Sequence, residues 1–116
     1  MTIFGVSQSS GVERRLKLER GDRGVVLTIT DHVENQEQER ILVQADNLLS
    51  AVMDRPPGGS TVEGISPSHG AKMLLDLEVR RNEVLLRARA GSGEGVDVAV
   101  GLDDFQDALE GVIARA

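Results

Sequence analysis

Residues 43–53 read VQADNLLSAVM and residues 100–110 read VGLDDFQDALE, and these two stretches carry the clearest structural signal in the chain. In each, an alternating apolar strand runs into an Asp, Asp46 or Asp103, after which apolar residues recur at three- and four-residue spacing. An Asp at that point can accept hydrogen bonds from the free N–H groups of a first helical turn. The repeat predicts two β-rich halves, each closed by a helix.

The remaining strands are predicted from alternating apolar and polar residues on either side of these junctions. The first helix is expected to end before Pro56, because a residue that precedes proline avoids helical geometry. In chain order, the expected elements are strands at residues 12–20, 25–30 and 40–45, a helix at 46–54, a short edge strand at 61–65, strands at 73–80, 83–90 and 96–100, and a helix at 103–114.

The length and composition of the chain predict one globular domain. A chain of 116 residues with 40% hydrophobic and 28% charged residues has room for a single modest core. Residues 1–11, rich in Ser and Gly, are expected to form a flexible leader to a domain at 12–116. Within that domain, a connector at 56–60 joins the halves 12–55 and 61–116.

The apolar helix faces predict the fold class. They need a sheet to cover, and antiparallel strands with alternating polar residues can leave their other face in water. We therefore expect an α+β fold, in which two pseudo-repeated β-β-β-α halves form an antiparallel sheet with the helices on one face. The second helix should pack against that sheet through the stripe of Phe105, Ala108, Leu109, Val112 and Ile113.

The solvated face of the predicted sheet is where a functional surface is expected. Cross-strand ion pairs explain most of its composition without a ligand, because basic and acidic residues are interleaved along the strands. Its polar residues include Arg15, Lys17, Thr28, Thr30, Arg40, Lys72, Arg80, Arg87 and Arg89, with Glu13, Glu19, Asp76, Glu78 and Asp97 between them.

Composition narrows the classes of function. The chain has no Cys, which excludes disulfides and thiolate metal sites. It has no initial apolar stretch and no apolar run of about 18 residues, so neither a signal peptide nor a membrane span is expected and the predicted location is the cytoplasm. The formal net charge of −6 repels nucleic acid. Phe4 and Phe105 are the only aromatic residues, so base-stacking platforms and interface anchors are few.

The sequence contains no pattern typical of an active site. His32 and His69 lie in predicted loops outside any metal-ligand spacing, and the acids at 103–104 are explained by the start of a helix. The glycine-rich stretches at 58–60 and 91–95 lack the Lys and Ser/Thr of a phosphate-binding loop. We predict no enzymatic activity, no cofactor and no metal site.

Residues 45–62, ADNLLSAVMDRPPGGSTV, resemble the central signature of the SsgA-like proteins of sporulating actinobacteria. That signature runs Ala-Arg-Asp-Leu-Leu, a Gly-Leu pair, Arg-Pro-x-Gly, a Gly-Asp-Val strand and a Pro-Ser segment. The chain departs from it in lacking two expected Trp residues, with Ile65 standing near the second of those positions. The matching positions are Ala45, Leu48, Leu49, Arg55, Pro56, Gly58, Val62, Pro67 and Ser68.

The resemblance covers residues 12–90 and is specific mainly at 45–70. It implies a fold similar to the whirly-type nucleic-acid-binding proteins, which that family uses for protein partners during septum placement rather than for catalysis. It also implies a homo-oligomer.

Two functional hypotheses follow. The first is a non-enzymatic interaction or scaffold protein of cell division or sporulation, which binds other proteins through Arg55, Pro56, Pro57 and Gly58. The alternative is a single-stranded nucleic-acid-binding protein that uses Arg80, Arg87 and Arg89. An acidic inhibitor that mimics nucleic acid is a third option, motivated by net charge alone.

Overall fold

The computed structural model describes residues 1–21, 24–31, 36–54, 56–91, 93 and 95–114. Each predicted strand and helix has a counterpart near its expected position. The elements are β1 (Thr2–Val6), β2 (Glu13–Gly21), β3 (Gly24–Asp31), β4 (Glu37–Gln44), α1 (Ala45–Asp54), β5 (Ser60–Ile65), β6 (Lys72–Arg80), β7 (Glu83–Arg89), β8 (Val96–Gly101) and α2 (Leu102–Ala114).

Strand β1 lies where the sequence predicted a flexible leader at residues 1–11. It pairs antiparallel with β2 along its whole length, from Thr2 opposite Lys17 to Val6 opposite Glu13. Ile3 packs against the core between two outward-facing neighbours. The Ser-rich composition that suggested a leader belongs to the turn that follows this strand, and a five-residue strand is too short to give a clear periodic signal.

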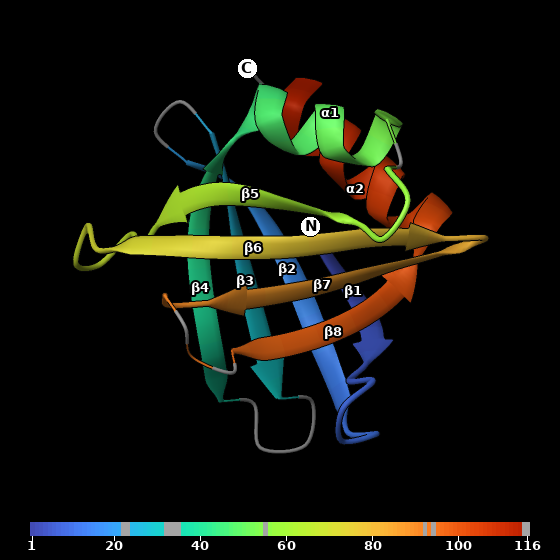
Figure 1. Ribbon diagram of the computed structural model, residues 1–116, viewed down its shortest axis with the longest axis horizontal. Helices are drawn as coiled ribbons and strands as arrows, with labels where there is room; N and C mark the ends of the chain where they lie inside the picture. The colour runs from blue at the N-terminus through green and yellow to red at the C-terminus, as the bar shows by residue number, and fades with distance from the viewer. Residues whose placement is uncertain (22–23, 32–35, 55, 92, 94, 115–116) are drawn as a thin grey trace.

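The eight strands form a closed antiparallel barrel in the order β1 to β8, which corrects the predicted fold class. Each half contributes four strands and a helix, not the β-β-β-α of the predicted fold class; the first half gains β1, and the four strands of the second half match those expected from the sequence. The apolar face of the strands, which we expected to be covered by helices, is turned into the barrel, where residues from facing strands cover one another. Figure 1 shows β5–β8 crossing in front of β1–β4.

The helices lie together at one end of the barrel instead of covering a sheet face (Figure 1). Helix α1 packs against β3–β6, and α2 packs against β1, β2, β7 and β8. Leu48 of α1 and Phe105 and Leu109 of α2 are almost completely buried. The predicted apolar stripe of α2 is therefore confirmed as core. No helix in the described part of the chain is long and apolar enough to cross a membrane.

Two narrow seams join the sheets β1–β4 and β5–β8. Strands β1 and β8 share a single register pair, Val6 with Ala99, and β4 and β5 share two, Leu42 with Ile65 and Val43 with Gly64. A Cβ added to Gly64 would lie 2.5 Å from the Leu42 carbonyl oxygen, so the second crossing requires a glycine.

Candidate binding groove

A hollow of about 510 Å³ lies on the outer face of β5–β8. Its floor includes Asp76 and Glu78 of β6, Leu85 and Arg87 of β7, and Asp97 of β8. Gly58–Thr61 of the connector and the start of β5 line one side, and Gln8 and Ser9 of the turn after β1 line the other. We call this hollow the arginine groove. It joins the connector to the segment that was predicted as a leader.

The strand register sets the order of side chains on the floor. Asp76 is paired with Arg87, and Arg87 with Asp97, so the three form one row across β6, β7 and β8. Leu85 lies in the next row of the same face, because side chains two residues apart on a strand point to the same side.

Two floor carboxylates each bind an arginine from their own sheet. The guanidinium of Arg89 donates to Asp76 at 2.7 and 3.3 Å, and the Thr61 hydroxyl adds a third bond at 2.8 Å. Arg80 donates to Glu78 at 2.6 and 3.1 Å. The hydrogen bond from Arg89 lowers the pKa of Asp76, and that from Arg80 lowers the pKa of Glu78. Both carboxylates are therefore ionised at neutral pH.

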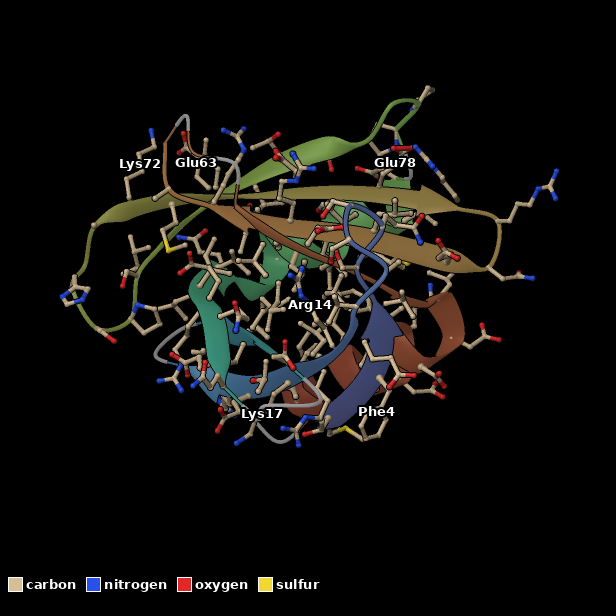
Figure 2. All side chains as sticks on the ribbon, turned by 90° about the horizontal axis from the view of Figure 1, so that it is seen from below. Phe4, Arg14, Lys17, Glu63, Lys72 and Glu78 are labelled. Carbon is tan, nitrogen blue, oxygen red and sulfur yellow. The ribbon has the colours of Figure 1, made fainter. Side chains whose placement is uncertain are left out.

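Asp97 organises a cluster that holds one wall of the groove. Its carboxylate accepts hydrogen bonds from the hydroxyls of Ser7 and Ser9 at 2.9 and 2.6 Å and from the Gln8 amide at 2.9 Å. Arg14 donates to the Asp97 carbonyl oxygen at 2.7 Å and lies 3.4 Å from its carboxylate. We call these five residues the Asp97 cluster. Figure 2 shows Arg14 between the two sheets, with Glu78 on the outer side of β5–β8.

The pKa of Asp97 reflects two opposed effects. Burial raises this pKa, but the hydrogen bonds from Ser9 and Ser7 outweigh burial and hold it below the usual Asp value. The anchoring carboxylate is therefore charged at neutral pH, and the turn it binds is fixed against β8.

Among the described residues, Arg87 is the arginine of the groove whose guanidinium is not hydrogen-bonded to a carboxylate. Each floor carboxylate has an arginine nearby: Arg89 for Asp76, Arg80 for Glu78 and Arg14 for Asp97. Within the part of the chain that the structure describes, no residue forms a hydrogen bond or ion pair with the exposed Arg87 guanidinium. The groove can therefore offer one guanidinium fork to an anionic group.

The structure separates the three arginines of the predicted nucleic-acid row. Arg80, Arg87 and Arg89 all lie on the outer side of β6 and β7, but Arg80 and Arg89 are bound to carboxylates and only Arg87 lines the groove. One available cation replaces the predicted row of three.

The predicted partner-binding residues are also divided. Gly58 lines the arginine groove, Pro56 lines a separate hollow of about 390 Å³ between α1 and β5, and Pro57 is exposed in the turn. Arg55, like His32, lies outside the described residues. His69 is in an exposed turn before β6.

Sequence reasoning missed the roles of Ser7, Ser9 and Asp97. Asp97 was placed among the solvated acids, and the two serines in a leader. The available signal was a run of small hydroxyl residues beside a glycine, but nothing in that run identifies a carboxylate 88 to 90 residues away.

No family model, curated protein or solved structure matches this chain. The resemblance to the SsgA-like proteins stays a prediction.

Proposed function

We propose that this protein is a non-enzymatic interaction protein that binds a segment of a partner protein in the arginine groove. The observation that carries the proposal is the exposed Arg87, which lacks a hydrogen bond or ion pair among the described residues and lies on the floor of a hollow with two walls. A volume of about 510 Å³ is in the range of sites that enclose several ligand groups. The outward-facing Leu85 next to Arg87 adds an apolar contact, so the groove combines the two kinds of interaction that a peptide segment can satisfy.

Single-stranded nucleic acid is the alternative occupant, and it has less support. A nucleic-acid backbone is bound by several cations along its path, whereas Arg80 and Arg89 already neutralise carboxylates. The net charge of −6 opposes a polyanion at long range. Arg87 alone is the observation that favours this alternative.

The chemistry of the groove favours binding over catalysis. Its carboxylates accept hydrogen bonds, and their pKa values are lowered, which makes them poor proton donors near neutral pH. The resemblance to the SsgA-like proteins supports the same class of function. By that resemblance, a cytoplasmic homo-oligomeric scaffold in the cell division or sporulation of actinobacteria belongs to the proposal.

The proposal is tested by comparing two leucine variants as baits. Leu85→Arg places a charge on the groove floor, and Leu74→Arg makes the same change on the same outer face, in the row beyond Asp76 and outside the groove. Both leucines are half-buried, and circular dichroism should show that both variants fold.

We expect a protein captured from the source cells by the wild type to be retained by Leu74→Arg and lost by Leu85→Arg. In calorimetry, the purified partner should then bind the wild type and Leu74→Arg, but not Leu85→Arg. Retention of the partner by Leu85→Arg would contradict the proposal. If the wild type instead binds a labelled oligo(dT) strand at low salt and Arg87→Ala abolishes this binding, the groove is a nucleic-acid site.

A further inference from the structure

The groove floor presents a charged and an apolar contact at a fixed spacing. Arg87 and Leu85 are two residues apart on β7 and face the same side, so their Cα atoms are about 6.6 Å apart along the strand. Leu85 is paired with Ala99 of β8, and Ala99 with Val6 of β1. Leu85, the buried Ala99 and Val6 therefore form an apolar row next to the polar row that contains Arg87, and of these three only Leu85 lines the groove.

The charges around Arg87 select the kind of anion that it can bind. Asp76 and Asp97 are its direct cross-strand neighbours, and such neighbours have Cβ atoms about 5 Å apart. Both are ionised, so they repel a doubly charged group more strongly than a singly charged one. A carboxylate carries a single charge and fits a guanidinium with two parallel hydrogen bonds. The site therefore favours a carboxylate over a doubly charged phosphate monoester.

An extended segment is the conformation that meets both contacts. Side chains of an extended peptide point to one side at every second residue, and their spacing equals that of Leu85 and Arg87 on the strand below. The connector wall lies close against β6 at Gly59, where an added Cβ would lie 2.7 Å from the Leu77 carbonyl oxygen.

We infer that the arginine groove binds an extended segment of a partner protein in which an acidic residue and an apolar residue are separated by one residue. The acidic side chain binds Arg87 and the apolar side chain packs on Leu85. This inference rests on the proposed function and specifies the partner's sequence at the groove.

Three labelled peptides with Gly-Ser flanks test the inference. Their centres read Glu-Ser-Leu, Lys-Ser-Leu and Glu-Ser-Gly, and binding to the full chain is measured by fluorescence anisotropy. We expect the wild type to bind Glu-Ser-Leu about tenfold more tightly than Lys-Ser-Leu, as for one charge-assisted contact. Glu-Ser-Gly should bind more weakly than Glu-Ser-Leu because it lacks the apolar contact.

Charge reversal is the decisive variant. Arg87→Glu should bind Lys-Ser-Leu more tightly than Glu-Ser-Leu. The matched control is Arg20→Glu, which makes the same change in net charge at an exposed position of β2 outside the groove and should keep the wild-type preference. Circular dichroism verifies that both variants fold.

The inference is overturned if the wild type binds none of the peptides, if Glu-Ser-Gly binds as tightly as Glu-Ser-Leu, or if Arg87→Glu still prefers the acidic peptide. The proposed function is tested by a different result, because it is contradicted when the captured partner is retained by Leu85→Arg. If a cellular partner depends on Leu85 but neither that partner nor the peptides respond to the charge at position 87, the interaction function stands and the acidic recognition does not.

Discussion

The two seams of the barrel are closed in different ways. Strands β1 and β8 meet at a single register pair, and the Asp97 cluster adds hydrogen bonds beside that pair. Strands β4 and β5 meet at two pairs, where the backbones cross closely at Gly64. Polar side chains therefore reinforce one seam, and close backbone contact forms the other.

The difference follows from chain connectivity. Helix α1 leads directly from β4 to β5, so bringing these strands together closes a short loop at small entropic cost. The first and last strands are far apart in the chain, and the bonds of the Asp97 cluster join residues 83 to 90 positions apart. The longer closure costs more entropy, and the cluster supplies polar contacts that offset part of it. The bonds from Gln8 and Ser9 also fix a wall of the binding groove.

The largest expected effect comes from removing the helical cover of the first seam. α2 packs against β1 and β8, and its Leu109 is 1% exposed. Leu109→Asp should destabilise the fold by about 4 kcal/mol or more, because it buries a charge without a partner. Leu49→Asp, in the helix over the second seam, should cost less because Leu49 is only partly buried. Urea unfolding followed by circular dichroism measures both, and a wild-type midpoint for Leu109→Asp would contradict this packing.

The second seam should be sensitive to a single methyl group. Gly64→Ala should lower the free energy of unfolding by about 2 kcal/mol, because the added Cβ meets the Leu42 carbonyl oxygen and strand crossings repack poorly. Gly101→Ala is the matched control at the end of β8, where the added Cβ would meet only the Asp104 side chain, at 3.3 Å. Equal unfolding midpoints for the two variants would show that the crossing is not tight.

The first seam should instead be sensitive to charge. Asp97→Asn weakens the hydrogen bonds from Ser7 and Ser9 and should cost about 1 to 2 kcal/mol at neutral pH. Asp107→Asn, on the exposed side of α2, serves as the control and should have little effect. Chemical unfolding at pH 7 compares the two variants. If Asp97→Asn is destabilised no more than the control, the Asp97 cluster does not stabilise the first seam.

The same variant gives a pH test with a defined sign. The folded-state pKa of Asp97 lies below its unfolded value, so its contribution to stability is present above the unfolded pKa, about 3.9, and is lost as pH falls through the folded pKa. The stability difference between wild type and Asp97→Asn should therefore shrink as the pH falls below about 4. A difference that stays constant down to pH 2 would contradict the charge-based closure. The pKa of Asp76 is also lowered, but its effect on stability is the same in both proteins and cancels when their free energies of unfolding are subtracted.

The smallest effect is expected at the turn that joins β5 to β6. His69 is exposed there, and its backbone N–H lies 3.4 Å from the Ser66 hydroxyl oxygen, a contact that does not involve the imidazole. His69→Ala should change the free energy of unfolding by no more than about 0.5 kcal/mol. Thermal melts at pH 7 check this value. A larger loss would mean that the turn contributes to the β4–β5 seam.

Local periodicity was sufficient for most elements of the fold and insufficient for their arrangement. The strand-to-helix junctions at Asp46 and Asp103 and the buried stripe of α2 could be predicted, because alternation and capping act between residues close in the chain. The prediction of an open sheet was wrong because an alternating strand buries one face equally well against helices or inside a barrel.

The candidate site shows the same division. The sequence by itself determined that Arg80, Arg87 and Arg89 lie on one side of adjacent strands, since side chains alternate with a period of two. Only the tertiary structure decided which of them has a free guanidinium, because pairing depends on carboxylates supplied by neighbouring strands. Closure at Asp97 was likewise a tertiary outcome, since its partners Ser7 and Ser9 come from the other end of the chain and short-range patterns carry no information about such distant contacts.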